Sequence, residues 1–411
     1  MKRDEFVGKH IQRTSAGWFA VESAEDILGN ILSRLPVKLL LILKVISKLW
    51  HRLIRSPNFT KLHLCQSREK PIYILFPFMD AIRSLYLMDA DGVITGTINL
   101  PGLENLPSLC MIGSYNGLIC FTNYPWFPHS FKTRAVVTDL EIRICNPATH
   151  EVWLLPNGSQ LKRELGIGVA FGPGISEYRV LRFFCSKSKS EVIRPECEIF
   201  SSSTRTWRSI GFVQHCPMGA HHAFVNGKVF WFIPSEEDHN IPGSILSVDL
   251  DENFKIIRLP VAVTEHAFLV DLEGCLSLIV VFDDDDIMVI WFLRDENESV
   301  WEEKCRDGIP YETVECLDSV AARKNDIFFI TEERYFIFSM IKMSWKELDF
   351  EELFEQHSPV VFTYTESLLP SSSDMSLNIL NRSLTYAFDK KRDQLKIELK
   401  HDSGSFGFVP V

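Results

Sequence analysis

The sequence has few of the features that mark secreted or membrane proteins. None of its ten cysteines lies at C-x-x-C spacing, and a chain of 411 residues can fold without disulfides. We therefore expect reduced cysteines within the core. The segment Met1 to Ala20 is too polar for a secretory signal, and apolar runs such as Leu39 to Leu43 are too short to span a membrane. We expect an intracellular protein of the cytoplasm, the nucleus or both, with no membrane partner.

Positive charge is also scarce. The chain has 43 basic against 54 acidic residues and a net charge of -11. No stripe of lysine and arginine is present to contact phosphates, which disfavours nucleic-acid binding. With 46% hydrophobic and 24% charged residues, the composition suffices for a large core and argues against a disordered chain.

Apolar residues are in excess near the amino terminus. Ser23 followed by two acidic residues is a helix start signal, and apolar side chains recur at helical spacing over residues 27–35 until Pro36. A second helix is predicted over residues 37–56. Between Ser23 and Arg55, 18 of 33 residues are apolar, more than two helices can bury alone. Either a partner or the following domain must cover the remainder, and the pattern by itself favours neither.

Three motifs of this region stand in a characteristic order and spacing: Glu25-Asp26-Ile27-Leu28, Ile31-Leu32-Ser33-Arg34-Leu35-Pro36-Val37-Lys38 and Val45-Ile46-Ser47-Lys48-Leu49-Trp50-His51-Arg52-Leu53-Ile54. Together they resemble the F-box of plant F-box proteins. The resemblance implies that the helices dock on the Skp-type adaptor of a cullin-RING ubiquitin ligase, which favours the partner. The family usually opens its first helix with Leu-Pro, where this chain has Ser23-Ala24, so we expect one edge contact to be missing and the affinity to be lower.

The resemblance also implies which residues bind the adaptor. The centre of the interface is expected at the turn Leu35-Pro36-Val37. The other candidate adaptor-binding residues are Ile27, Leu28, Ile31, Leu32, Leu40, Leu43, Val45, Ser47, Lys48, Trp50, Leu53 and Ile54. The sequence does not divide these residues between adaptor docking and the stability of the module.

From Pro71 onward, short runs of β-branched and aromatic residues alternate with turn residues, which indicates an all-β domain. A unit of strand, polar turn and aromatic residue recurs, with a weaker copy over residues 85–89. The recurring aromatic residues, 44 to 54 positions apart, are Trp153, Trp207, Phe254, Trp301 and Trp345. Asn-Gly pairs at 116–117 and 226–227 predict tight hairpins between these units. Four strands about every 50 residues are typical of a kelch-like β-propeller blade, which predicts about six blades. We expect the recurring aromatic residues to pack between blades.

Several further motifs lie within this region: Gly113-Ser114-Tyr115-Asn116-Gly117-Leu118, Asn146-Pro147-Ala148-Thr149, the Gly-x-x-Phe-Gly-Pro run from Gly168, Glu177-Tyr178-Arg179-Val180, Trp207-Arg208-Ser209-Ile210 and Tyr364-Thr365-Glu366-Ser367-Leu368. Together they resemble the F-box-associated domain of plant proteins. The predicted organisation is a disordered segment over 1–22, an F-box module over 23–64, a propeller over 71–369, and a weakly ordered tail or closing strand over 370–411.

Three further segments are candidate binding sites. Residues 124–129 form an aromatic and proline-rich insertion, which is either a recognition loop or a flap over the domain; the candidate target-binding residues in it are Tyr124, Trp126, Phe127 and His129. The acidic run 283–286 is predicted to be a solvated turn. Neighbouring residues His221 and His222 of a strand point to opposite faces, which argues against a shared metal ion.

The sequence predicts a non-catalytic substrate receptor that binds a Skp-type adaptor and an unknown target protein, with no cofactor and no metal. The motifs of serine hydrolases, P-loop enzymes, dinucleotide-binding proteins and zinc hydrolases are absent, although propeller enzymes often build their sites from scattered loops. The alternatives are a propeller enzyme, a lectin, or a scaffold without a link to ubiquitin.

Overall fold

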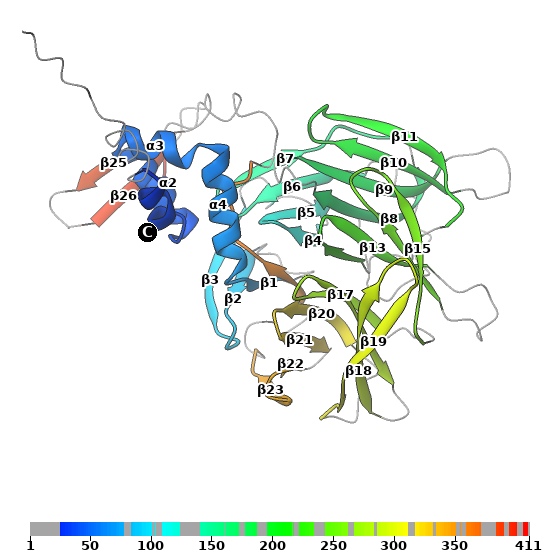
Figure 1. The fold of residues 1–411 in the computed structure, drawn as a ribbon. Helices are drawn as coiled ribbons and strands as arrows, with labels where there is room; N and C mark the ends of the chain where they lie inside the picture. The colour runs from blue at the N-terminus through cyan, green and yellow to red at the C-terminus, as the bar shows by residue number, and fades with distance from the viewer. Residues whose placement is uncertain are drawn as a thin grey trace, which may run out of the picture.

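The computed structural model describes most of residues 25–370 and three strands beyond them. Within that range it leaves out residues 78–83, 101–102, 104–108, 124–139, 160, 172–176, 187–194, 216, 218–221, 234–242, 262–266, 283–285, 311–316, 332–333, 351–353 and 355–358. The described residues form a helical module followed by a ring of β-sheets (Figure 1).

The module consists of four short helices. They are a helix over residues 25–32, α2 (Val37–Ile46), α3 (Lys48–Ile54) and α4 (Pro57–Arg68). The single helix expected over 37–56 is broken at Ser47, whose extended backbone (φ -135°, ψ 132°) separates α2 from α3. The fourth helix was not predicted, although Pro57 at its first turn and the Ser56 hydroxyl, which accepts from the Phe59 amide at 3.1 Å, are ordinary start signals. None of the described helices has the length and apolar character needed to cross a membrane.

Six antiparallel sheets of four strands each confirm the predicted propeller of about six blades. Blade 1 contains β24 (Pro359–Tyr364), β1 (Ile72–Pro77), β2 (Ser84–Met88) and β3 (Ile94–Asn99); blade 2 contains β4 (Cys110–Tyr115), β5 (Leu118–Thr122), β6 (Ile142–Asn146) and β7 (Glu151–Leu154); blade 3 contains β8 (Leu161–Phe171), β9 (Tyr178–Ser186), β10 (Pro195–Ser201) and β11 (Thr206–Phe212). Blade 4 contains β12 (His222–Val225), β13 (Lys228–Ile233), β14 (Ser244–Val248) and β15 (Phe254–Arg258); blade 5 contains β16 (Ala267–Leu272), β17 (Cys275–Phe282), β18 (Ile287–Asp295) and β19 (Val300–Gly308); blade 6 contains β20 (Leu317–Arg323), β21 (Asp326–Thr331), β22 (Tyr335–Ser339) and β23 (Ser344–Leu348).

The ring is closed by a strand from the far end of the domain. Strand β24 pairs with β1 in antiparallel register, from Ile72 opposite Tyr364 to Pro77 opposite Pro359. The first strand of each blade faces its counterparts in the two adjacent blades, so β24, β4, β8, β12, β16 and β20 surround a central channel. Beyond this closure, β25 (Leu384–Asp389), β26 (Gln394–Lys400) and β27 (Phe406–Val409) pair with one another in a separate sheet.

The Asn-Gly pairs make the hairpins that the sequence predicts. Asn116 and Gly117 have φ of 52° and 84°, and Asn226 and Gly227 have 50° and 85°, as a two-residue type I′ turn requires. At Gly117 a side chain would also collide with residues 365–367, because a Cβ there would overlap the Thr365 carbonyl oxygen and the Ser367 Oγ atom. This position therefore needs glycine for two independent reasons.

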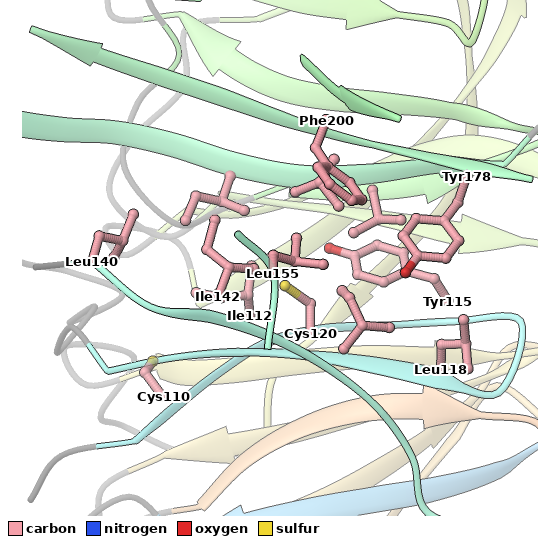
Figure 2. Packing of buried hydrophobic residues seen from close by; sticks show 14 of the residues in the cluster. Cys110, Ile112, Tyr115, Leu118, Cys120, Leu140, Ile142, Leu155, Tyr178 and Phe200 are labelled. Atoms are coloured by element: carbon pink, nitrogen blue, oxygen red, sulfur yellow. The ribbon is translucent and has the colours of Figure 1, made fainter. Parts of the chain in front are cut away.

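Four of the five recurring aromatic residues contact a neighbouring blade, as expected, whereas the aromatic rings against Trp345, those of Phe329, Phe336 and Phe338, belong to its own blade. The Trp207 indole in blade 3 donates to the Pro156 carbonyl oxygen after blade 2 at 2.7 Å, and the Trp301 indole in blade 5 donates to the Arg258 carbonyl oxygen of blade 4 at 2.8 Å. Trp153 of blade 2 lies edge-on to a ring of blade 3, Phe200, at 5.5 Å between centroids. Figure 2 shows the interior at this boundary, where Tyr115 and Ile142 of blade 2 meet Tyr178 and Phe200 of blade 3.

Replacement of Trp207 by Phe tests the packing between blades. We expect this variant to lower the free energy of unfolding by about 1 kcal/mol, because it leaves the Pro156 carbonyl oxygen without its indole donor. Trp345→Phe is the matched control, since the buried Trp345 indole nitrogen has no hydrogen-bond partner among the described residues. The measurement is chemical denaturation, and a Trp345→Phe loss as large as that of Trp207→Phe would contradict the assignment.

Candidate protein-binding surfaces

Exposed large apolar side chains are concentrated on the helical module. Thirteen such side chains are exposed among the described residues, and six of them come from residues 27–49. We call these six the exposed apolar set: Ile27, Ile31, Leu39, Val45, Ile46 and Leu49. The other seven are spread over residues 93–343. Because each such side chain gains about 1.5 to 3 kcal/mol on burial, their concentration on a short module is the mark of a protein-binding surface.

The opposite side of the module forms its core. Leu32, Leu40, Ile54 and Phe59 are buried there, and the half-buried Leu368, from the segment after β24, packs against them. The leucine-rich run of α2 therefore has one side turned inward and another turned to solvent. The sequence left two covers open, the following domain and a partner. The segment after β24 covers the inward side of these helices, and their outward side is exposed among the described residues.

The predicted adaptor-binding residues fall into three groups by exposure. The exposed ones are Ile27, Ile31, Pro36, Val45 and Lys48; the half-buried ones are Leu28, Leu35, Leu43, Ser47, Trp50 and Leu53; the buried ones are Leu32, Val37, Leu40 and Ile54. Val37, expected at the centre of the interface, is fully buried, and its amide donates to the Glu366 carboxylate at 3.0 Å. In the structure, the four buried residues thus pack inside the chain.

Three exposed large apolar residues of the module were not among the predicted adaptor-binding residues. Leu39, Ile46 and Leu49 are 46%, 68% and 39% exposed. The spacing of seven residues from Leu39 to Ile46 puts both on one side of α2, and this is the signal that was available. It was masked because apolar residues occur all round the helix.

His63 connects the helices of the module. It is 1% exposed, its Nε2 atom lies 3.1 Å from the Leu35 carbonyl oxygen, and the Ser67 hydroxyl lies 3.5 Å from Nδ1. Because a carbonyl only accepts, Nε2 must carry the proton of the neutral ring. Burial lowers the pKa of His63 below its usual 6.5, and the Leu35 carbonyl and the Glu366 carboxylate oppose this shift.

On the propeller, the central channel opens into a cavity of about 890 Å³. Its rim carries charged residues of both signs, and the turns around it are linked to one another. Asn226 Nδ2 donates to the Gly274 carbonyl oxygen at 2.7 Å, Asn325 Nδ2 to Glu273 Oε1 at 2.9 Å, and Lys228 pairs with Glu296 at 2.7 Å. The end of α4 joins the same rim, where the Arg68 guanidinium donates to Asn116 Oδ1 at 2.5 Å.

The remaining predicted sites are only partly described. The candidate target-binding residues Tyr124, Trp126, Phe127 and His129 lie outside the described residues, in the connection between β5 and β6. His221 and residues 283–285 also lie outside the described residues. His222 is described, and its Nε2 atom is hydrogen-bonded to the Tyr115 hydroxyl. Within the described part of the chain, no group of three or more His, Cys, Asp or Glu side chains could hold a metal ion.

Comparison with known families matches both parts of the chain. The profile of the F-box associated beta propeller domain covers residues 93–347, and that of the F-box domain covers residues 25–62. The chain belongs to the F-box proteins with an associated β-propeller. The resemblance seen in the sequence is thereby confirmed, and the helical module is the F-box.

Curated relatives of this F-box protein come from Arabidopsis thaliana. F-box protein CPR1 is 26% identical over 303 residues, which is 66% of this chain and 69% of CPR1. F-box protein At5g07610 is 26% identical over 369 residues, 82% of each chain. A putative F-box/kelch-repeat protein, At3g17280, is 25% identical over 251 residues, 57% of this chain and 59% of the relative.

The His63 geometry predicts how acid affects the F-box. A histidine whose folded pKa lies below its unfolded value must stay neutral in the folded state, so stability is complete above the unfolded pKa of about 6.5 and declines as the pH falls below it. We expect His63→Gln, whose amide can still donate to the Leu35 carbonyl oxygen, to weaken that decline. Denaturation at pH 7.5 and 5.5 measures it, with the exposed His51→Gln as control. Equal pH dependence in wild type and His63→Gln would contradict the prediction.

Proposed function

We propose that this F-box protein is the substrate-recognition subunit of an SCF-type cullin-RING ubiquitin ligase. The F-box docks on a Skp-type adaptor, and the propeller holds a target protein. The observation that carries the proposal is the exposed apolar set, because six large apolar side chains on three short helices need a protein to cover them. Family membership supports the same role, since the chain joins an F-box to a propeller.

The mechanism requires surfaces but no reactive group. A receptor that holds the target and the ubiquitin-charged enzyme in one assembly raises their effective concentration, and the transfer is carried out by other subunits. The relevant properties of this chain are therefore a stable adaptor surface, a stable target surface and a fixed distance between them.

The two surfaces are proposed to lie at opposite ends of the propeller. The F-box meets the end of the channel at which the hairpins of residues 116–117 and 226–227 lie. Because the strands are antiparallel, the connections between the second and third strands leave from the other end. The connection from Thr122 to Ile142, which holds the predicted target-binding residues, is the longest of these. Long connections on a rigid scaffold are where recognition residues concentrate.

A ligand-binding or catalytic propeller is the second candidate, and the channel cavity is its best support. Several polar groups of the rim already bond to neighbouring blades, such as Asn226, Asn325 and Lys228. These contacts join neighbouring blades and hold the ring together. We therefore favour the receptor.

Charged substitutions in the exposed apolar set test the proposal. We expect the double variant Leu39→Glu and Ile46→Glu to weaken binding to a purified Skp-type adaptor at least about tenfold. Burial of the two apolar side chains in the interface is favourable, whereas burial of two unpaired carboxylates is unfavourable. Titration calorimetry measures the affinity. Because both positions are exposed, the unfolding midpoint should stay unchanged.

Ile341→Glu is the matched control, since Ile341 is 76% exposed but lies on the propeller. It should bind the adaptor like the wild type. If the wild type does not bind, the receptor proposal fails; if the double variant binds as tightly as the wild type, the exposed apolar set is not the interface.

A further inference from the structure

The chain segment that follows the ring-closing strand belongs to two cores at once. We call residues 365–369 the strap. Leu368 packs against the buried residues of the F-box, including Leu40 and Ile54. Its neighbour Leu369 is 2% exposed and belongs to the core shared by blades 2 and 3. Adjacent side chains of an extended chain point to opposite sides, so one short segment can serve both cores.

The strap also completes helix α2. The residue at the N-cap position of α2 is Pro36, which has no side chain able to accept a hydrogen bond, and the first turn of α2 contains no acidic residue. The Glu366 carboxylate supplies both missing elements, since its Oε2 atom lies 3.0 Å from the Val37 amide nitrogen. It satisfies a donor that the helix leaves unpaired and places a negative charge at the positive end of the helix dipole.

The strap is fixed firmly to the propeller. The Asn146 side chain is fully buried, and its Nδ2 atom donates to the carbonyl oxygens of Ser367 at 3.0 Å and Leu369 at 2.7 Å. Gly117 comes so close to the strap that a methyl group would not fit between them. Immediately before the strap, Tyr364 pairs with Ile72 in the closing sheet. The position of the strap is therefore set by closure of the ring.

The F-box helices are too short to do without such support. Helix α2 has 10 residues and α3 has 7. Isolated helices below about 12 to 15 residues are marginal in water, and most helical stability in proteins comes from packing. A cap and a core contact from the strap are thus a substantial part of what holds α2 in place.

We propose that Glu366 and Leu368 are positioning residues for adaptor binding, through which the adaptor surface depends on a closed propeller. Helix α2 carries Leu39, Val45 and Ile46 of the exposed apolar set, and it receives its cap and its inner contact only when β24 has paired with β1. A chain in which β24 has not paired with β1 then has a less ordered helix α2 and binds the adaptor more weakly. This inference rests on the proposed function, because it concerns the same adaptor.

Two substitutions in the strap test the inference in the full-length chain. We expect Leu368→Ala and Glu366→Gln each to weaken binding to the purified Skp-type adaptor about threefold to tenfold. Leu368→Met, which keeps a large apolar side chain at this position, should bind like the wild type. Amide hydrogen exchange should become faster over residues 37–54 and remain unchanged over residues 267–308 of blade 5. The second measurement separates loosening of the F-box from unfolding of the propeller.

The chain offers a matched control for each substitution. Leu154→Ala removes a leucine that is 45% exposed on blade 2, and Glu298→Gln neutralises an exposed glutamate in blade 5. Both should match the wild type in affinity and in exchange over residues 37–54.

The outcomes distinguish this inference from the proposed function. If the wild type binds the adaptor and both strap variants bind equally well with unchanged exchange over residues 37–54, the strap inference is overturned and the receptor proposal stands. If exchange becomes faster over 37–54 but the wild type does not bind, the receptor proposal is overturned and the structural dependence of α2 on the strap stands. Faster exchange over residues 267–308 as well would overturn the inference, because the loss would then be one of global stability.

Discussion

A blade of four strands has two apolar faces, and in a propeller only the neighbouring blades can cover them. This constraint requires the ring to close, and in this protein the closure is the pairing of β24 with β1. The pairing joins strands that stand at the two ends of the propeller sequence. The interfaces bridged by the Trp207 and Trp301 indoles join blades that are consecutive in the chain, whereas the closure joins the first and last strands of the propeller. The F-box is attached at this closure, through the start of β1 and the end of β24.

The apolar surplus of the F-box is explained by two covers rather than one. Inward-facing residues such as Leu40 and Ile54 pack against one another and against Leu368 of the strap. Outward-facing residues such as Leu39 and Ile46 have no such cover within the described chain. A helix with apolar residues on all sides usually lies inside a protein, and under the proposed function the adaptor would cover the side that this chain leaves exposed. An isolated module of this composition would associate non-specifically. Packing of one side on the propeller segment leaves a single defined apolar surface.

The features that could be predicted from the sequence are those with local or periodic signals. Asn116 and Gly117 marked a hairpin because only that turn type demands two positive φ values, and the recurring aromatic residues marked the blades. What could not be predicted depends on residues far apart in the chain. No local pattern predicts that Tyr364 pairs with Ile72 or that Glu366 caps the helix that begins at Val37. The sequence left open the division of the F-box residues between core and surface for the same reason, since it depends on where the strap lies.

The short junction between the F-box and the propeller fixes their relative geometry, which matters for the proposed receptor function. Residues 69–71 alone separate α4 from β1, and the strap and the Arg68 contact to Asn116 hold the module at further points. A flexible linker would spread the bound target over a large volume and lower its effective concentration at the charged enzyme. A module tied at several points keeps that volume small, at the cost of limiting which lysines of a target can be reached. Selectivity would then arise in two places: in the loops that bind the target, and in the fixed direction in which the F-box presents it.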